Sequence, residues 1–568
     1  MDRSGNGNNW TVNNITYADQ MVDSPTNNFA TLNPLGGLQT STITFSEGNL
    51  KASNAAGGTE PIASSTIAMT SGKWYFEYRN LSGNGSVGIQ DTNNAGQSYI
   101  YHDNQGGFGS GYYYNGSLRA TDGQDANYGA AWGNTDIIGV ALDVDNGTLV
   151  FYKNNASQGT AETGLPSSAS LGYRFVISTD AATAMANFGQ DSSFAGNSTA
   201  QGNQDGNGIG DFYYTPPTGF LALCTSNLPD VAVVPSENFN TVLFTGNGST
   251  QTVTGTGFQP DWVWNKSRNT THGHALFDAV RGGTRRLASE STQEERTNEG
   301  NIAFTSDGFN VTASHPTVNN NNSPMVSWNW KAGNATLGTG DFTQGSTAST
   351  CSRNVDAGFS IVSYTGNGSA GATIGHGLNS IPEMIFLKSR TSSIAWGGQN
   401  ATTGATKNLF LNQTDAAESN ILYWNNTAPT TNVFSLGASH VVNKSSDNYI
   451  AYCFHSVDGY SKVGTYSGNG NADGTFVYTG FRPAFVLCKR TDGGDSWIIL
   501  DSTRDTYNVA NHSLWPNLSD AEGQVANKQI DIVSNGFKHR QTSNQLNGAN
   551  NYIYLAFAET PFKYSNAR

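Results

Sequence analysis

Charged residues are scarce in this chain of 568 residues. Asp, Glu, Lys and Arg together make up 13% of it, and the formal net charge at pH 7 is −14. A protein that binds phosphate backbones needs clustered Lys and Arg. The one basic cluster, Arg281-Gly-Gly-Thr-Arg-Arg286, is too short to outweigh the acidic excess. The composition therefore argues against a nucleic-acid partner.

Long apolar runs are missing as well. No stretch approaches the roughly 20 apolar residues that a membrane-spanning helix needs. The start of the chain, Met1-Asp-Arg-Ser-Gly5, is polar and begins no signal peptide. We therefore expect that the protein is made in the cytoplasm and does not insert into a membrane. Any extracellular role would be reached without a conventional leader.

Cysteine is rare, with four residues in the chain: Cys224, Cys351, Cys453 and Cys488. Cys453 and Cys488 lie in a repeated pattern whose sister copies carry Asn, Ala or Leu at the same positions. A cysteine that forms a disulfide or binds a metal is not expected to be replaced by such residues in the sister copies. A cysteine that only fills space in a core can be replaced by another small or apolar residue. We predict that the cysteines are buried as small apolar fillers.

Glycine and asparagine, by contrast, are abundant, with 66 glycines in the chain, and aromatic residues make up 11% of it. Short alternating apolar runs are separated by Asn-Gly, Asp-Gly and Gly-Gly pairs, and no long helical periodicity occurs. Asn and Gly tolerate the positive φ that tight hairpins require. The sequence therefore predicts an all-β protein with many hairpins.

One pattern occurs three times in the C-terminal part. Each copy has a Gly-Asn-Gly turn, then a proline followed by an apolar run, and finally an aromatic strand. The turns are Phe244–Ser249, Tyr364–Ser369 and Tyr466–Asn471, the runs are Pro260–Lys266, Pro382–Lys388 and Pro483–Lys489, and the closing strands are Met325–Trp330, Tyr449–Phe454 and Tyr552–Phe557. We predict three tandem β-sandwich-like repeats in an elongated array: repeat 1 (237–335), repeat 2 (357–458) and repeat 3 (459–568).

The N-terminal part divides into three segments. Residues 1–66 are rich in Asn, Thr and Ser and are predicted to be an arm or connector with one or two short strands, residues 67–195 are strand-like, and residues 196–236 form a linker. The strand-like segment contains, in this order, the motifs Gly72–Glu77, Gly139–Gly147, Val150–Asn154 and Asn187–Gly189. In this order and spacing they resemble a SPRY domain. The resemblance implies a two-sheet antiparallel β-sandwich whose known roles are mostly in protein interaction, and it implies no catalysis.

Further motifs resemble structural proteins of bacteriophages that infect aquatic bacteria. They are the segment Gly210–Pro229 after the SPRY-like region, the start Asp2–Trp10, the repeats that end in aromatic strands, and the terminus Pro561–Arg568. The lectin-like sandwich that precedes such a start in that group is missing here. The resemblance implies a virion protein: a tail fibre or similar appendage that recognises a host surface polysaccharide or protein, with other virion proteins as partners.

Two alternatives to this host-attachment role stay open. One is a purely structural fibre or a capsid decoration protein, and the other is a polysaccharide depolymerase hidden in a repeat. We expect no enzyme and a homo-oligomer. Repeated weak sites gain avidity when several copies act together, and analogy with phage fibres favours a homotrimer.

An Asp and an Arg three residues after it occur in repeats 1 and 3 and are both absent from repeat 2. The pairs are Asp278 with Arg281 and Asp501 with Arg504, and repeat 2 has Asn400 and Thr403 instead. An enzyme could use the Asp as a base or nucleophile and the Arg as its charge partner. Joint loss favours an ion pair that holds a turn, because a lone buried charge is costly. We predict structural ion pairs and no catalytic residue.

Tyrosines gather between two predicted strands of the SPRY-like region. Tyr112-Tyr-Tyr-Asn-Gly116 and Trp132 lie where members of that family have binding loops. Exposed Tyr-rich loops make adaptable contacts. Tyr112, Tyr113, Tyr114 and Trp132 are therefore candidate binding residues, with packing between modules as the alternative.

Two sets of residues in the repeats have a functional and a structural interpretation. Trp262 and Trp264 point to one side of a strand and could stack on a sugar, but other apolar residues replace them in the sister repeats, which favours a core. Lys266, Lys388 and Lys489 recur together. They could bind an acidic glycan, although a solvated strand end is favoured.

The sequence predicts no cofactor and no metal. Asp143–Gly147 has a carboxylate spacing that could hold calcium, but its place between two strands favours a hairpin. Asp205–Asp211 is a better calcium loop that lacks a further acidic ligand, and the sequence leaves its role open. His272 and His274 stand alone, and no GxSxG, phosphate-binding loop or paired-glutamate pattern is visible.

Overall fold

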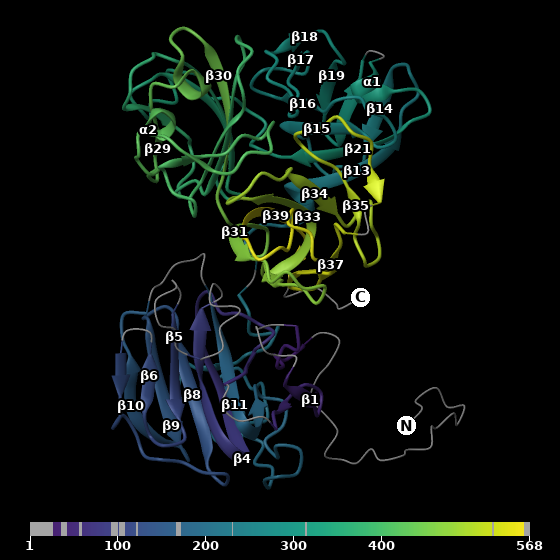
Figure 1. The fold of residues 1–568 in the computed structure, drawn as a ribbon. Helices are drawn as coiled ribbons and strands as arrows, with labels where there is room; N and C mark the ends of the chain where they lie inside the picture. Colours follow the sequence, from purple (N-terminus) through teal and green to yellow (C-terminus); the bar gives the residue numbers. More distant parts are fainter. Residues whose placement is uncertain are drawn as a thin grey trace, which may run out of the picture. The chain divides into compact units, whose positions relative to one another are not determined.

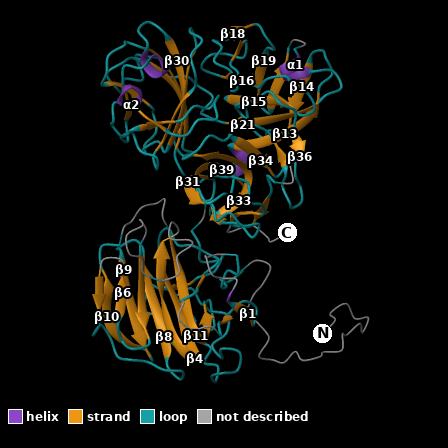
Figure 2. Cartoon of the chain, viewed as in Figure 1, coloured by secondary structure: helices purple, strands orange, loops and turns teal. Residues whose placement is uncertain are grey.

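The computed structural model describes residues 27–35, 42–55, 60–91, 100, 108–120, 123–165, 172–229, 231–312, 315–524 and 527–561. Within them the chain is almost entirely β, with antiparallel sheets and three α-helices of one turn each (Figure 2). The chain divides into two compact units, Met1–Pro229 and Asp230–Arg568 (Figure 1). No described helix has the length and apolar character needed to cross a membrane. The predicted all-β class is confirmed.

The N-terminal unit is built on one network of paired strands. Its described strands are β1 (Thr44–Ser46), β2 (Lys51–Ser53), β3 (Ile62–Ser64), β4 (Lys73–Asp91), β5 (Gly109–Tyr113), β6 (Leu118–Ala120), β7 (Gly123–Asp125), β8 (Ile137–Asp143), β9 (Thr148–Lys153), β10 (Ala156–Glu162), β11 (Tyr173–Asn187) and β12 (Leu221–Ala222). The main path runs β1-β2-β11-β4-β5-β6-β7, and β8, β9 and β10 continue from the other half of β4.

The long strands β4 and β11 pair along most of their length and carry the chain from one sheet layer to the other. The first half of β4 pairs with β8, from Lys73↔Asp143 to Arg79↔Ile137. The second half pairs with β5 instead. The change falls where β11 has a bulge between Asp180 and Thr183, and bulges bend strands in this way. The segment Asp143–Gly147 is the predicted hairpin, because β8 pairs directly with β9.

The described parts of the two flanking segments, predicted to be an arm or connector (1–66) and a linker (196–236), pair with the sheet of this unit. Where an arm is expected, β2 and β3 both pair with β11. Where a linker is expected, β12 adds to β4 in parallel. The carboxylate of Glu77 on β4 accepts hydrogen bonds from the backbone amides of Tyr213 and Tyr214 at 2.8 and 2.7 Å. Burial raises the pKa of Glu77 to about 7, although these hydrogen bonds favour the ionised form.

The C-terminal unit contains the three repeats. Repeat 1 has β13 (Phe239–Thr245), β14 (Gln251–Thr254), β15 (Trp262–Ser267), β16 (Ala275–Asp278), β17 (Arg285–Arg286), β18 (Arg296–Thr297), β19 (Ile302–Thr305), β20 (Gly308–Val311), α1 (Pro316–Asn319) and β21 (Pro324–Trp330), after a 3-10 helix, η4 (Pro235–Glu237). Repeat 2, with β22 (Ser349–Asn354) before it, has β23 (Phe359–Thr365), β24 (Ala372–Gly375), β25 (Met384–Ser389), β26 (Gly397–Asn400), β27 (Lys407–Asn408), β28 (Glu418–Ser419), α2 (Ile421–Trp424), β29 (Val433–Leu436), α3 (His440–Asn443) and β30 (Asn448–Phe454). Repeat 3 has β31 (Ser461–Ser467), β32 (Phe476–Tyr478), β33 (Phe481–Arg490), β34 (Ile498–Asp501), β35 (His512–Ser513), β36 (Gly523–Gln524), β37 (Ile530–Val533), β38 (Gly536–His539) and β39 (Asn551–Pro561).

The three repeats share one topology. The main sheet has the order β13-β21-β15-β16 in repeat 1, β23-β30-β25-β26 in repeat 2 and β31-β39-β33-β34 in repeat 3. A smaller sheet faces each main sheet: β14-β20-β19, β24-β29 and β32-β38-β37. In every repeat the closing aromatic strand therefore lies between the first strand and the strand that follows the proline.

Each main sheet has buried apolar residues on both of its faces. One face packs on the smaller sheet of the same repeat, as Val263 and Phe277 do in repeat 1. The other face enters a core that all three repeats share. That core includes Trp262, Trp264, Trp328, Trp330, Phe359, Met384, Phe386, Tyr452, Phe454, Phe485, Leu487, Leu555 and Phe557.

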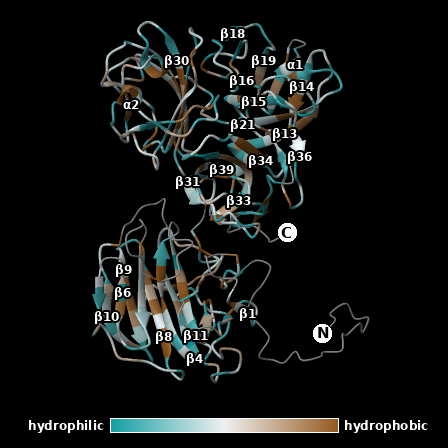
Figure 3. Ribbon diagram, viewed as in Figure 1, coloured by the Kyte–Doolittle hydropathy of each residue, from teal (hydrophilic) through white to brown (hydrophobic). Residues whose placement is uncertain are grey.

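The shared core corrects the expectation of separate modules in an elongated array. In Figure 1 the teal, green and yellow strands of the three repeats converge, and in Figure 3 hydrophobic residues follow the strands of the main sheets. Trp262 and Trp264 are 2% and 1% exposed and lie in this core, so the prediction of core packing is confirmed for both.

Candidate functional site

The predicted ion pair of repeat 1 exists and lies at the boundary with repeat 2. Arg281 Nε lies 2.5 Å from Asp278 Oδ2, and neither side chain is exposed. The hydroxyl of Tyr452, from repeat 2, donates to the same Oδ2 at 2.7 Å. A buried carboxylate is tolerated here because charged and neutral donors surround it.

Repeat 3 builds the same arrangement against repeat 1. Arg504 Nε lies 2.5 Å from Asp501 Oδ2, and both side chains are again fully buried. The donor from the neighbouring repeat is Trp328 Nε1, at 3.1 Å from Asp501 Oδ2. Trp328 is the sister residue of Tyr452, so the two boundaries use the same position for the same purpose.

A second acid extends each ion pair across its boundary. Glu295 of repeat 1 binds Arg281 at 3.3 Å and Arg390 of repeat 2 at 2.9 Å. Glu522 of repeat 3 binds Arg504 at 3.0 Å and Arg268 of repeat 1 at 2.7 Å. Burial alone would raise the pKa of Glu295, but the hydrogen bond from Arg390 and the charge of Arg281 lower it overall.

The boundary between repeats 2 and 3 has lost the whole network. The sister positions are occupied by Asn400, Thr403 and Ala417 in repeat 2 and by Leu555 and Thr491 in repeat 3. The backbone register is nevertheless kept. The Ala417 amide donates to the Thr491 carbonyl at 2.9 Å, as the Glu295 amide does to the Arg390 carbonyl. The members of this network, namely the Asp, the Arg, the Glu and their partners, are thus present or absent as one set. Loss of one member alone would leave the charge of another buried and unpaired.

Ring nitrogens join the three repeats in a closed cycle. The Trp396 indole donates to the Ala288 carbonyl of repeat 1, and the Trp497 indole to the Phe410 carbonyl of repeat 2, both at 2.9 Å. His274 occupies the same position in repeat 1, and its Nε2 lies 3.0 Å from the Trp515 carbonyl of repeat 3. Burial lowers the pKa of His274 to about 3, so the ring is neutral. Each repeat therefore contacts both others through equivalent atoms.

The recurring lysines are buried, so the expectation of a solvated strand end is wrong, and their burial also argues against an acidic-glycan site. Lys266, Lys388 and Lys489 are each 0% exposed. Lys388 Nζ donates to the Thr292 carbonyl of repeat 1, and Lys489 Nζ to the Thr414 carbonyl of repeat 2. Burial lowers the pKa of Lys388 to about 7 and those of the other two to about 8. No sequence pattern separates such lysines from exposed ones, because part of the environment of Lys388 and Lys489 comes from the neighbouring repeat.

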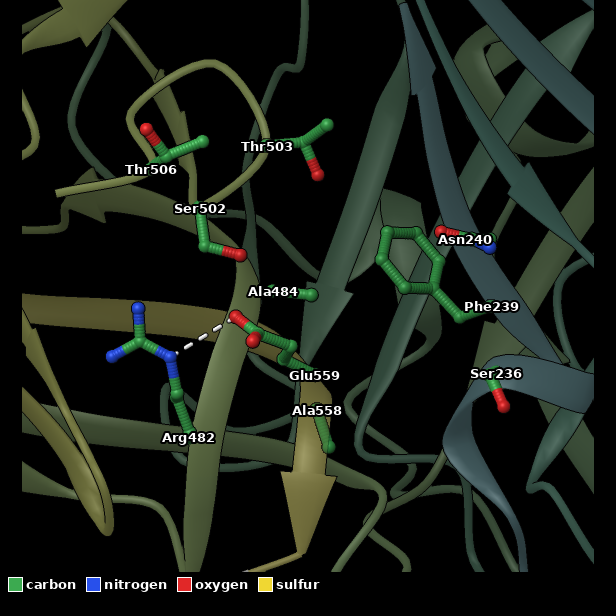
Figure 4. A pocket seen from close by; sticks show the side chains of 10 residues that line it. All are labelled: Ser236, Phe239, Asn240, Arg482, Ala484, Ser502, Thr503, Thr506, Ala558 and Glu559. Atoms are coloured by element: carbon green, nitrogen blue, oxygen red, sulfur yellow. Dashed lines mark hydrogen bonds and ion pairs between the residues drawn. The ribbon is translucent and has the colours of Figure 1, made fainter. Parts of the chain in front are cut away.

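A pocket of about 310 Å³ opens between repeats 1 and 3. Figure 4 shows Ser502, Thr503 and Thr506 toward one side and Asn240, Phe239 and Ser236 toward the other, with Ala484, Glu559 and Ala558 between them and Arg482 beside Glu559. Arg482 Nε lies 3.0 Å from Glu559 Oε2. The sequence did not lead to a prediction of this pocket. The feature that could have indicated it is the small Ala484 after the proline, where the sister repeats have an acidic residue.

Comparison with known families assigns the C-terminal unit. The profile of a family described as "Domain of unknown function (DUF7483)" matches residues 234–561, which is more than half of the chain and contains all three repeats. The chain belongs to the DUF7483 family. A SPRY domain profile matches residues 73–191, which confirms the SPRY identification of the N-terminal unit.

Three solved structures are similar to part of the chain. One is titled "Stonustoxin structure", with 20% identity, a TM-score of 0.22 and coverage of 28% of this chain and 26% of that one. The TRIM65 PSpry domain has 15% identity, a TM-score of 0.22 and coverage of 28% and 90%. The SPRY domain of human HERC1 has 12% identity, a TM-score of 0.21 and coverage of 29% and 96%. The chain thus spans about a quarter of the stonustoxin chain.

The tyrosines of the SPRY unit are not an exposed loop. Tyr112 and Tyr113 lie in β5 and are 0% and 4% exposed, and Trp132 is 5% exposed. Tyr112 donates to the Ala130 carbonyl and packs edge-on against Trp132. The prediction of exposed binding residues is therefore wrong for these three, because all of them are buried. Tyr114 alone of the set is substantially exposed, at 38%.

The DUF7483 and SPRY units bury their cysteines, as predicted: all four are free and buried. Asp205 in the candidate calcium loop accepts hydrogen bonds from the amides of Asn207, Ile209 and Ala222, so its carboxylate holds the loop together. Among the described residues, no group of three or more His, Cys, Asp or Glu is placed to hold a metal.

Proposed function

We propose that the chain is a non-catalytic virion protein of a bacteriophage, a tail fibre or similar appendage that recognises a polysaccharide on the host surface. The motif order of the chain supports the phage origin, since a SPRY unit followed by aromatic-ended repeats resembles structural proteins of phages. Other virion proteins are the partners that hold it on the particle.

One observation carries the non-catalytic part of the proposal. Two pairs of acids that recur in the DUF7483 unit are committed to arginines: Asp278 and Asp501 within a repeat, and Glu295 and Glu522 across a boundary. Glycoside cleavage needs two carboxyl groups that face a sugar and exchange protons with it. Carboxylates buried against guanidinium groups support scaffolding instead, and leave recognition to the surface.

The test is incubation of the intact chain with a panel of bacterial surface polysaccharides. Pull-down measures binding, and size-exclusion chromatography of the polysaccharide measures chain length before and after. Binding without shortening is expected. Shortening would replace the proposal by a depolymerase, and absence of binding would leave a purely structural fibre or capsid decoration. Immunogold labelling of purified particles tests the virion location, and unlabelled particles would contradict it.

A further inference from the structure

The pocket between repeats 1 and 3 is lined by Ala484, whose sister positions in the other two repeats carry an acid. In repeat 1, Asp261 follows the proline and accepts hydrogen bonds from the amides of Ala332 and Gly333 at 2.7 and 3.0 Å. In repeat 2, the sister residue Glu383 accepts one from the Ser456 amide at 2.6 Å. Each carboxylate holds the segment after the closing aromatic strand against its own repeat.

Repeat 3 departs from this arrangement in sequence and in structure. Its residue after the proline is Ala484, which has no group to bind backbone amides. The segment after Phe557 instead continues along β33, where Ala558 pairs with Pro483. Ala484 and Ala558 both line the pocket. The pocket therefore lies where repeat 3 lacks the carboxylate that its sister repeats use to hold the following segment.

The lining of the pocket is polar and neutral. Four of the residues that line it carry a hydroxyl group: Ser236, Ser502, Thr503 and Thr506. In the described part of the chain, none of these four hydroxyls hydrogen-bonds to another protein group. A hydroxyl both donates and accepts, so the set suits a ligand that is itself rich in hydroxyl groups.

The charges beside these hydroxyls cancel. Arg482 binds Glu559 and also donates to the Ile532 carbonyl at 3.0 Å. An anionic ligand would have to compete with Glu559 for the guanidinium group, and a cationic ligand with Arg482 for the carboxylate. The pocket therefore favours a neutral ligand over a charged one.

A loop found only in repeat 3 borders the pocket. Between Arg504 and Trp515 the chain is four residues longer than between the sister positions of repeats 1 and 2. The loop contains Thr506, which lines the pocket, and next to it Tyr507, which is 86% exposed. A tyrosine offers a flat apolar face at a small cost in conformational entropy, which suits the face of a sugar ring.

We propose that this pocket is the subsite for one neutral sugar residue of the host glycan, with Ser502, Thr503 and Thr506 as hydrogen-bonding groups and Tyr507 as a stacking surface. The inference rests on the proposed function and assigns its ligand contact to repeat 3. The volume of about 310 Å³ lies at the lower end of the range of roughly 300–1,000 Å³ typical of small-molecule sites. It therefore has room for one sugar ring.

The experiment uses the full chain and titrates it by ligand-observed NMR with neutral methyl hexosides and methyl N-acetylhexosaminides. The intact chain is also tested on the polysaccharide panel. Three variants alter the pocket: Thr503→Ala with Thr506→Ala, Tyr507→Ala, and Ala484→Leu, which fills it. The matched control is Thr402→Ala, because Thr402 is the sister residue of Thr503 in repeat 2 and lines no part of this pocket. The double threonine variant removes hydroxyls without protein partners, so it tests the site even if Ala484→Leu fails to fold.

Saturable binding of one neutral glycoside is expected, with Kd raised at least tenfold in the pocket variants and unchanged in Thr402→Ala. Polysaccharide binding that the pocket variants leave intact would overturn the pocket inference and keep the proposed function. Binding to charged polysaccharides alone, with no neutral glycoside bound, would also overturn the pocket inference. A chain that binds no polysaccharide and no glycoside would overturn both.

Discussion

Single side chains show that a buried charge is kept in this protein only together with all of its partners. Asp501 is bound by Arg504 and by Trp328 of another repeat, and Arg504 is bound in turn by Glu522. Removing one partner of a buried pair typically costs about 3–5 kcal/mol, because the remaining charge stays unpaired. Replacing the whole network of charged residues by neutral ones costs less free energy of unfolding, because no unpaired charge remains. The boundary between repeats 2 and 3, which has neutral residues at these positions, is an example within this chain.

We expect Asp501→Asn to lower the free energy of unfolding by about 3–5 kcal/mol. Adding Arg504→Thr should recover part of the loss, since no unpaired guanidinium group then remains. The recovery is incomplete, because Glu522 keeps only its bond to Arg268. Urea unfolding of Asp501→Asn, Arg504→Thr and the double variant, with the exposed Asp356→Asn as control, measures the coupling. Losses that simply add would contradict it.

The pH dependence of stability tests the buried lysines. Burial lowers the pKa of Lys388 to about 7, whereas a lysine in the unfolded chain keeps its proton to about pH 10.4. Between these values the unfolded state binds more protons, so the folded state gains stability as pH rises, by at most about 1.4 kcal/mol per pH unit. Below pH 7 the lysine is charged in both states and its burial cost is fully present.

The difference in unfolding free energy between the wild type and Lys388→Met should therefore rise from pH 7 to pH 9. Urea unfolding at several pH values measures it. The half-exposed Lys407→Met in the same repeat is the control for replacing a lysine by methionine. A flat difference for Lys388→Met would show that the folded protein does not disfavour the charged form.

At the level of strands and their boundaries, the three repeats differ in how firmly they are joined. Two boundaries have a buried ion network, and the boundary between repeats 2 and 3 has none. Within that boundary Asn400 also leaves its Nδ2 buried without a hydrogen-bond partner among the described residues. The three boundaries have the same backbone hydrogen bond, so differences in local stability come from the side chains.

Hydrogen exchange should detect this difference. The amides of Glu295, Ala417 and Glu522 each donate across a boundary, at 2.9, 2.9 and 2.6 Å. We expect the Ala417 amide to exchange at least tenfold faster than the other two, because local opening there breaks no ion pair. The amides of Leu287 and Leu409, sister positions inside repeats 1 and 2, are the control and should be alike. Equal exchange at all three boundaries would contradict the prediction.

For the chain as a whole, the shared core decides which parts can exist alone. Among the described residues, one cluster of buried apolar side chains joins all three repeats and lies within the C-terminal unit. A single repeat cut from the unit would expose one face of its main sheet to water. The repeats are therefore a unit of folding, although each has its own small core.

We expect a fragment of residues 231–561 to unfold in one cooperative thermal transition, followed by circular dichroism. A fragment of residues 357–458 should lack such a transition, because Phe359, Phe386, Trp396, Tyr452 and Phe454 lose their neighbours from repeats 1 and 3. A fragment of residues 27–229 is the control for the effect of cutting the chain. A cooperative transition in isolated repeat 2 would contradict the shared-core argument.

The homotrimer stays a prediction. Multivalency favours several copies, and many aromatic residues of the repeats are buried within one chain. Light scattering on the intact 60.3 kDa chain decides the question, with a mass of three chains expected. A stable monomer at micromolar concentration would count against it.

The sequence by itself determined the β class, the SPRY motifs, the three repeats and the two ion pairs, because turn residues, strand periodicity and the joint loss of Asp and Arg are local signals. It did not reveal that Lys266, Lys388 and Lys489 are buried, or that Tyr112 and Trp132 are buried. Burial depends on which distant segment covers a side chain. The sequence of one repeat does not show which segments of the other repeats pack against it. The closed cycle of repeats and the pocket beside Ala484 were likewise decided by tertiary structure, because both exist only where two repeats meet.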